Sequence, residues 1–372
     1  MICGGGARRL ARRRWPAGLL ALLVLGSGCA QPGYVARLGW TEAQILWRRE
    51  PITALLDRPD VDPELRERLA LVLAAREFAR DRLGFRVGEA YRSYARVTKS
   101  EATVHVVSAA YRDRLALRSW WYPIAGRVPY RGYFAAADAR REGDRLERQG
   151  FDVAVRPAIA FSTLGWFADP LLSTTAEEAA VPLVTTVLHE LFHQSLYVPG
   201  ASAFNESAAT FAGERGAVAF FCSGPRADAV RCTEARASWR ATRGRGRILG
   251  RLADRLRRLY ASRPAPSVRE RRRRAYAALA GRSLERRRLG TRADVLPPNN
   301  ARLLGELLYL TRLDDFEALA PGLEDPGPAL RRLMAAARGT RDPFRTLDRL
   351  LAGGGDGGRQ GKLHDGVGSP YK

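Results

Sequence analysis

Apolar residues recur at helical spacing along most of the chain, so the pattern predicts a mainly helical protein. Asp62-Pro63-Glu64 supplies a cap, a proline at the first helical position and an acid in the first turn of a helix that ends at Gly84. Beyond Cys232 the chain also reads as helical. The apolar stripe there is Ile248, Leu252, Leu256 and Leu259. Asn299 or Asn300 caps a later helix. Further helices are expected over residues 41–49, 135–149, 176–198 and 204–220.

Alternating or β-branched patterns predict only a few strands. Residues 103–109 and 151–156 have this character, and residues 158–166 extend the second strand. His105 falls in the first strand and is interpreted as a sheet residue. The fold class is therefore α+β, mainly helical, with a small sheet. Successive regions are 1–28 (signal peptide), 29–95 (N-terminal helical region), 96–232 (catalytic core), 233–352 (basic helical region) and 353–372 (glycine-rich disordered tail).

The first residues have the features of an export signal. Five arginines between Arg8 and Arg14 precede a short apolar run, Ala17 to Gly26, which is too short for a membrane span. Gly26-Ser27-Gly28-Cys29 is similar to a lipobox, although Gly26 stands where leucine is usual. We expect an exported protein lipidated at Cys29 and anchored in a membrane, facing the periplasm. A plain secretory cleavage site, giving a soluble periplasmic protein, is the alternative.

Export changes how the cysteines and the charge are interpreted. Cys222 and Cys232 would meet an oxidising compartment and form a disulfide, with two free buried thiols as the alternative. The net charge is +23, and residues 236–292 hold twenty arginines but three acids. Nucleic acid is not expected as a partner of an exported protein. Anionic lipid headgroups or other anionic envelope polymers are the candidate partners. An arginine-rich solvated helical face is the alternative.

The most specific chemistry lies in His189-Glu190-Leu191-Phe192-His193, within the apolar helix at 176–198. Two histidines four residues apart share one helix face, so both imidazoles reach one metal ion. Glu190 lies beside that face, where it would polarise a water on the metal. The competing interpretation is a helix that carries two histidines by accident.

A catalytic zinc site needs a third protein ligand, and Glu206 is the candidate. It follows His193 by thirteen residues, after a reversal at Pro199-Gly200. Asn205 and Glu214 are candidate residues around the ligands, and Glu214 is also a backup ligand. The alternative for Glu206 is an acid favoured by the helix dipole in a first turn.

The motif, followed by Asn205-Glu206-Ser207-Ala208-Ala209-Thr210-Phe211, resembles the gluzincin metallopeptidases. More closely, the chain resembles a bacterial family of predicted aminopeptidases that are often lipoproteins, over most of residues 29–350. Two features depart from well-studied gluzincin aminopeptidases: the gap from His193 to Glu206 is shorter, and no GAMEN-type segment is visible. Further landmarks of the family are Tyr91-Arg92-Ser93-Tyr94, Tyr122 to Gly126, Tyr130 to Phe134, Ser162 to Phe167 and Asn299 to Leu303.

The resemblance implies a zincin-like catalytic domain that binds Zn2+ and hydrolyses peptide substrates. Glu190 would be the general base. Tyr197 and Tyr309 are candidate donors to the oxyanion. Residues 158–165 would form an edge strand beside the substrate, with Ser162 and Thr163 in the cleft; a core strand is the alternative.

The predicted function is a zinc-dependent peptidase of the bacterial cell envelope, and the family resemblance favours an aminopeptidase. One alternative is a zinc endopeptidase. Another is an envelope-binding lipoprotein with a structural zinc, whose working surface is the basic region. The two classes differ at the metal, because a structural site is closed by a fourth protein ligand and a catalytic site is open.

Overall fold

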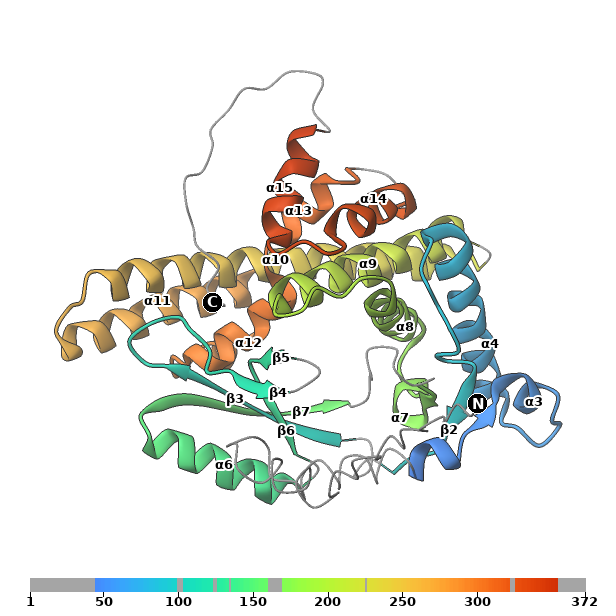
Figure 1. Cartoon of the computed structure of the whole chain (residues 1–372), viewed down its shortest axis with the longest axis horizontal. Coiled ribbons are helices and arrows are strands. Elements are labelled where there is room, and N and C mark those ends of the chain that lie inside the picture. The colour runs from blue at the N-terminus through green and yellow to red at the C-terminus, as the bar shows by residue number, and fades with distance from the viewer. Residues whose placement is uncertain are drawn as a thin grey trace, which may run out of the picture.

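The fold is described from a computed structural model of the chain. The residues that it describes are 44–98, 103–122, 126–133, 135–159, 169–224, 226–321 and 325–353. The predicted signal peptide, Cys29, the segment 160–168 with Ser162 and Thr163, and the predicted tail from residue 354 lie outside them. The described part is a mainly helical α+β protein, which confirms the predicted fold class (Figure 1).

A three-stranded antiparallel sheet lies on one side of the molecule, in the order β6-β3-β7. These strands are Arg131–Tyr133, Thr103–Tyr111 and Phe151–Ile159, so both predicted strands are confirmed and each extends a few residues further. Helix α6, Ala136–Arg148, covers one face through a small apolar cluster, and α12, Asn300–Leu310, lies on the other (Figure 1).

Short strands complete the β structure of the described residues. Trp120–Tyr122 (β4) pairs with Gly126–Val128 (β5) in an antiparallel hairpin. A second small sheet has the order β1-β2-β8 and is formed by Glu50–Pro51, Ser93–Ala95 and Leu171–Leu172. This sheet holds the N-terminal segment against the chain that leads into the motif helix.

The N-terminal helices are α3, Ile52–Leu56, and α4, Pro63–Phe78. Asp62 caps α4 by accepting hydrogen bonds from the backbone N–H groups of Glu64 and Leu65, as its position before a proline predicts. A π-helical turn over Ala79–Leu83 continues α4 to Gly84. Gly84 has a φ of 78°, a left-handed conformation that glycine adopts without strain.

The single helix predicted over residues 176–198 is wrong at both ends. The structure has a short helix α7, Ser173–Ala176, and then the motif helix α8, Ala180–Ser195. Pro182 explains the late start, because proline lacks the N–H group of an interior helical residue and fits only in the first turn. At the other end Leu196 is already extended, with φ −145° and ψ 119°.

Helix α9, Ser202–Ser223, begins two residues before the predicted start. Asn205 and Glu206 therefore lie inside its first turns and do not open it. Cys222 near its end forms a disulfide with Cys232, and the two Cα atoms are 4.8 Å apart. Cys232 belongs to α10, Ala229–Ala261, so the disulfide joins the end of one helix to the beginning of the next.

The C-terminal helices pack over the site-bearing pair. Helix α10 forms a long antiparallel hairpin with α11, Pro266–Arg286 (Figure 1). The side chain of Asn299 caps α12 by accepting a hydrogen bond from the N–H group of Arg302, which confirms the predicted cap. The remaining helices are a 3-10 turn at Arg292–Asp294, α13 at Leu313–Ala318, α14 at Gly327–Ala337 and α15 at Pro343–Gly353.

One large hydrophobic cluster unites segments that are far apart in the chain. It runs from Ile52 in α3, through α4, α8 and α9, to Leu347 in α15. A second cluster joins α10, α11 and α12 to the sheet. Residues of three predicted regions thus share one core, while the predicted region boundaries stay predictions. None of the described helices is long and apolar enough to cross a membrane.

Candidate metal centre

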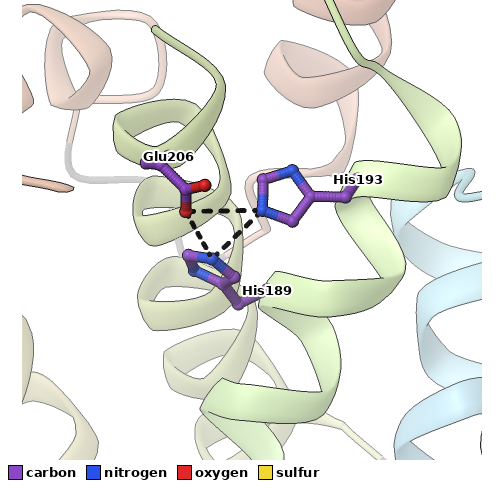
Figure 2. Close-up of side chains that lie close together, drawn as sticks. All are labelled: His189, His193 and Glu206. Atoms are coloured by element: carbon purple, nitrogen blue, oxygen red, sulfur yellow. Dashed lines mark hydrogen bonds and ion pairs between the residues drawn. The ribbon is translucent and has the colours of Figure 1, made fainter. Parts of the chain in front are cut away.

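The structure brings His189, His193 and Glu206 together at the crossing of α8 and α9. The histidines occupy one face of α8, one turn apart, and Glu206 faces them from the beginning of α9 (Figure 2). Among the described residues, these three form the one group of acidic, histidine or cysteine side chains that is close enough to hold a metal ion. The structure thus brings together, from two helices, the three residues that the sequence predicts as metal ligands.

The three candidate ligand atoms form a nearly regular triangle. The Nε2 atoms of His189 and His193 are 3.3 Å apart. The Oε2 atom of Glu206 lies 3.4 Å from His189 Nε2 and 3.5 Å from His193 Nε2. Ligands about 2.0–2.1 Å from a tetrahedral zinc ion stand roughly 3.3–3.4 Å from one another, so this spacing fits such an ion.

Two glycines on α9 allow the close crossing of the helices. A Cβ atom on Gly213 would lie 2.6 Å from the carbonyl oxygen of Thr185 and 3.1 Å from the Cβ of His189. A Cβ atom on Gly216 would lie 2.8 Å from Leu188. Side chains at these positions would push α9 away from the ligand-bearing face of α8. The observed distance between α8 and α9 therefore depends on glycine at these two positions.

The connection between the helices is held by Asn205. Its side-chain oxygen accepts a hydrogen bond from the N–H group of Val198 at 2.9 Å, and its amide nitrogen donates to the Val198 carbonyl oxygen at 2.8 Å. Asn205 is buried, so both bonds lie away from water. The residue predicted to support the ligands therefore closes the reversal that places Glu206 opposite the histidines.

The centre is closed on one side and open on the other. The His193 side chain is 4% exposed, whereas His189 is 15% exposed and Glu206 is 18% exposed. No fourth histidine, cysteine or carboxylate joins the group within the described residues. An open position beside three protein ligands is typical of catalytic metal sites, since structural sites are closed by a fourth ligand.

The electrostatics of the buried triad also favour a cation. Burial by itself would raise the pKa of Glu206, but hydrogen bonds with His189 and His193 hold it below the ordinary range. Burial opposes protonation of His193, but the adjoining carboxylates of Glu206 and Glu190 outweigh it and raise the pKa. Two carboxylates beside two imidazoles therefore make a site that a divalent cation would balance.

Glu190 is half-buried beside the triad and lies near the buried Tyr91, which belongs to a family landmark but was not predicted as a site residue. Burial raises the pKa of Tyr91, and the nearby carboxylate of Glu190 raises it further. Tyr91 has a φ of 57°, a costly left-handed conformation for a tyrosine. Its N–H group donates to the carbonyl oxygen of Asp169 at 2.8 Å, which helps to hold that conformation.

Tyr309, one of the two predicted oxyanion donors, lies directly against a ligand. Its ring stacks on that of His189, with centroids 6.1 Å apart and an interplanar angle of 28°. The guanidinium carbon of Arg156, on β7, is 5.8 Å from the Tyr309 ring centroid. Burial raises the pKa of Tyr309, with Glu206 adding to the shift and Arg156 opposing it. The phenol therefore stays protonated near the metal ligands.

Two other tyrosines lie near Glu206. Tyr197, the second predicted donor, is 36% exposed, and burial with the Glu206 charge raises its pKa. Tyr130 was missed as a site residue, although it belongs to one of the family landmarks. Burial is the main cause of its raised pKa, and the charges of Glu206 and Glu190 add to it. A lone tyrosine far upstream of the motif carries no spacing signal, so only folding reveals its place.

Glu214, the backup ligand, lies two turns along α9 and is not part of the triad. It accepts hydrogen bonds from the hydroxyl groups of Ser238 at 3.3 Å and Thr242 at 2.8 Å, both on α10. Burial raises the pKa of Glu214, and the charge of His189 opposes that shift. Glu214 therefore links α9 to α10 behind the metal centre.

A comparison with protein families matches residues 33–335 of this chain to the family described as "Putative aminopeptidase". The chain belongs to this family. The match spans the small sheets, the motif helix, the Glu206 helix and the C-terminal helices as far as α14. No curated protein matches the chain, and no solved structure matches it either. The resemblance to a family of predicted aminopeptidases is thereby confirmed, and the family description indicates a peptidase.

Proposed function

We propose that the protein is a zinc-dependent aminopeptidase of the bacterial cell envelope, with His189, His193 and Glu206 as the metal ligands. The observation that carries this proposal is the triangle of ligand atoms, with sides of 3.3, 3.4 and 3.5 Å, open on one side. A divalent ion bound there supplies Lewis-acid chemistry, which polarises a peptide carbonyl and makes water more acidic. Two imidazoles and one carboxylate favour zinc.

Glu190 is the general base of the proposed reaction. It takes a proton from the attacking water and later gives it to the leaving amine. Its carboxylate is half-buried beside the ligand face of α8, and its charge acts on His193, Tyr91, Tyr130 and Tyr309. Glu190 is not one of the three ligands, so it is free to accept the proton.

Tyr309 is the proposed donor to the oxyanion that forms at the scissile carbonyl. Its phenol remains protonated at neutral pH, its ring stacks on His189, and the guanidinium carbon of Arg156 is 5.8 Å from the ring centroid. A neutral hydroxyl beside a guanidinium presents fixed donors to developing negative charge. Tyr197 is more exposed and lies on the connection between α8 and α9, which makes it the weaker candidate.

The envelope location is proposed from the N-terminal sequence and the disulfide. The arginine-rich start, the short apolar run and Cys29 support export with lipidation, and the alternative is a soluble periplasmic protein. A disulfide between Cys222 and Cys232 suits an oxidising compartment.

Two variants test the proposal together. Wild-type protein should hold about one zinc ion per chain, and Glu206→Ala should lose it because one of three ligands is removed. Glu190→Gln should keep the zinc but lose activity by about a hundredfold or more, because only the general base is removed. Elemental analysis and peptide hydrolysis measure the two effects.

The choice of substrates separates the two peptidase classes. An aminopeptidase cleaves peptides with a free amino end and spares the same peptides when that end is acetylated. Equal cleavage of both forms would identify an endopeptidase. Wild-type protein without zinc would overturn the metallopeptidase proposal, and full activity of Glu190→Gln would overturn the role of Glu190.

A further inference from the structure

A hollow lies at the turn between α10 and α11. In Figure 1 this turn is at the left end of the molecule, away from α8. It has a volume of about 760 Å³ and is open to solvent. The end of α10, the α10–α11 connection, the first turn of α11 and the turn after β3 form its walls. A volume of this size holds a small molecule or a lipid headgroup.

The walls of the hollow carry a strong excess of positive charge. Arg114, Arg257, Arg263 and Arg269 line it, and Asp113 is the only acidic residue among the described residues of the lining. Asp113 pairs with Arg114 at 3.4 Å, and Asp254 pairs with Arg257 at 2.6 Å from outside the lining. No described residue forms an ion pair with Arg263 or Arg269, so these two guanidinium groups are unneutralised at the hollow.

This lack of partners is not general among the arginines of α10 and α11. Arg245 pairs with Asp294 and Glu306 at 2.9 and 2.7 Å, and Arg243 lies 2.7 Å from Asp314. Arg273 is buried and pairs with Asp152 at 2.8 Å. The basic region therefore has several of its more buried charges matched. Arg263 and Arg269 have no acidic partner among the described residues, like exposed arginines such as Arg282 and Arg286, but they differ from those two in lining the hollow.

The backbone around the hollow adds to its preference for anions. Pro264 and Arg269 flank the N-terminus of α11, a helix of 21 residues whose cap position, Ala265, has no side chain that accepts its first N–H groups. The positive end of the helix dipole thus opens toward the arginines. Arg263 has a φ of 43°, a strained conformation that the turn imposes.

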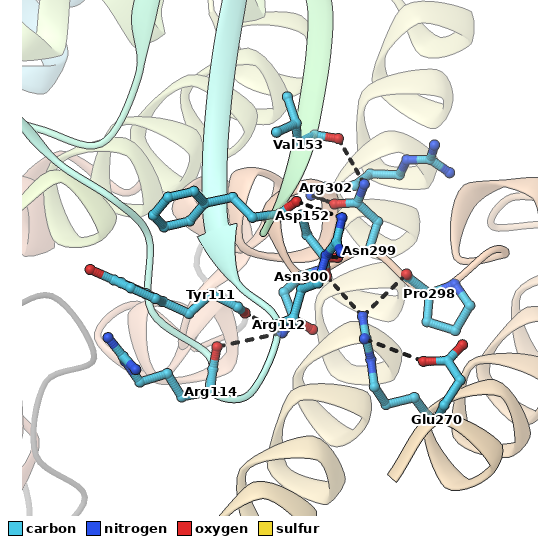
Figure 3. A network of polar contacts seen from close by, with 12 residues as sticks. Tyr111, Arg112, Arg114, Asp152, Val153, Glu270, Pro298, Asn299, Asn300 and Arg302 are labelled. Atoms are coloured by element: carbon cyan, nitrogen blue, oxygen red, sulfur yellow. Dashed lines mark hydrogen bonds and ion pairs between the residues drawn. The ribbon is translucent and has the colours of Figure 1, made fainter. Parts of the chain in front are cut away.

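A polar network around Asn300 and Asp152 joins the sheet to the start of α12 (Figure 3), and Tyr260, which lines the hollow, is bonded to it. The Tyr260 hydroxyl donates to the side-chain oxygen of Asn300 at 2.9 Å. The Asn300 amide nitrogen donates to the carbonyl oxygen of Tyr111 at 2.8 Å, and the Asn300 N–H group donates to Asp152 at 2.8 Å. These bonds tie Tyr260, at the end of α10, to α12 and the sheet.

We propose that this hollow binds a phosphate group carried by a small molecule or a lipid headgroup. Guanidinium forks match the oxygens of phosphate with paired hydrogen bonds, and each of the four segments that form the walls contributes one arginine. Leu115 and Tyr260 give the hollow an apolar wall for the rest of the ligand. The site is independent of the metal centre, because it shares no residue with it.

The test compares the full-length wild type with two double variants of equal charge. Arg263→Gln/Arg269→Gln removes the unmatched charges at the hollow. Arg282→Gln/Arg286→Gln removes two exposed arginines from the other end of α11, roughly 20 Å away along the helix. Calorimetry with pyrophosphate, and cosedimentation with vesicles that contain phosphatidylglycerol, measure binding at low salt. All three proteins share the N-terminal segment, so differences in binding between them result from the substituted arginines.

Wild type and the Arg282/Arg286 variant should bind alike, while the Arg263/Arg269 variant should bind at least tenfold more weakly. Loss of pyrophosphate binding in that variant supports a soluble phosphate ligand. A loss confined to vesicles supports a lipid headgroup. Equal weakening of both variants would show a diffuse effect of charge and overturn the site, as would wild-type protein that binds neither probe. Unchanged circular dichroism melting verifies that the variants fold.

Discussion

At the scale of single residues, Tyr309 offers the sharpest test of the proposed chemistry. Removing its hydroxyl in Tyr309→Phe leaves the ring that stacks on His189 but takes away the donor. We expect kcat to fall by about 10²–10³-fold, as loss of one oxyanion donor does, with zinc content unchanged. Steady-state kinetics and elemental analysis measure both.

Tyr276→Phe is the matched control, because Tyr276 lies on α11 and packs with the second cluster. It should leave kcat unchanged. If Tyr309→Phe lowered kcat/KM by raising KM and left kcat unchanged, Tyr309 would be assigned to substrate binding. That result would contradict the oxyanion role.

Asp294 provides a prediction about pH. Burial would raise its pKa, but the hydrogen bond from Arg245 and bonds from Thr291 outweigh that effect and lower it. Because the pKa is lower in the folded state than the ordinary value near 4, the carboxylate stabilises the fold above that pH. The stabilisation disappears as the pH falls through the folded pKa.

Asp294→Asn should therefore lower the free energy of unfolding at pH 7 by about 1 kcal/mol or less, since the side chain is 31% exposed. The difference from wild type should shrink at pH 3 and vanish at still lower pH. Urea unfolding at each pH measures it, with Asp144→Asn on the exposed face of α6 as the control. A difference that grows toward acid pH would contradict the assignment.

Sequence spacing predicts some of the site residues and does not predict others. His189, Glu190 and His193 share one short segment, so helical periodicity alone places them. Glu206 follows from the reversal at Pro199-Gly200. Tyr91 and Tyr130 come from separate segments that meet the centre only through tertiary packing. Both belong to family landmarks, but no spacing relative to the histidines marks them as site residues.

At the scale of helices, the crossing of α8 and α9 depends on Gly213. Gly213→Ala would place a methyl group 2.6 Å from the Thr185 carbonyl oxygen, and the helices would have to separate. We expect the free energy of unfolding to fall by about 1–3 kcal/mol, and zinc affinity to fall because Glu206 moves with α9. Denaturant unfolding and zinc competition titrations measure the two effects.

Gly250→Ala is the matched control for this substitution. Gly250 is an interior residue of α10, and a Cβ atom there meets nothing within 4 Å. Alanine has the higher helix propensity, so this variant should be more stable by about 0.4–1 kcal/mol. If both variants stabilised the protein, the close crossing would not constrain the metal centre.

Helix boundaries were less predictable than helix positions. Apolar periodicity located α4, α6, α8, α9 and α12, because each buries one face or most of its surface. It could not place the break between α7 and α8, which depends on Pro182, nor the early end of α8 at Ser195. The Asn205 hydrogen bonds to Val198 replace helical bonds there, and such a tertiary competitor leaves no periodic signal.

At the scale of the whole molecule, one hydrophobic cluster ties the N-terminal helices to the last ones. It includes Ile52, Phe204, Phe316 and Leu347, so no region buries its apolar face alone. We expect a single thermal transition with equal calorimetric and van't Hoff enthalpies. Differential scanning calorimetry measures this, and two resolved transitions would contradict it.

A truncated variant that ends at residue 312 tests the same cooperativity. It lacks α13–α15, which cover Phe204 and Phe211 through Phe316 and Phe344. We expect this variant to lose cooperative melting. A control that ends at residue 353 should melt like the full chain, because it keeps all the described helices.

The ion pairing of the many arginines can also be determined only in the folded molecule. The sequence presents residues 236–292 as a run of arginines, which predicts either a solvated face or an anionic partner. In the fold, acids from distant segments meet several of them, as Asp152 meets Arg273 and Asp314 meets Arg243. Pairing between segments so far apart cannot be inferred from local composition.

The contact between Tyr309 and His189 determines when the proposed peptidase centre is completed during synthesis of the chain. The two residues are separated by α9, α10 and α11, so a growing chain presents both histidines and Glu206 long before it presents the tyrosine. The proposed peptidase centre is therefore incomplete until α12 has docked. If the protein is exported as proposed, a precursor still threading through an export channel would lack this centre, and the proposed peptidase activity would begin only when the finished protein has folded at its destination.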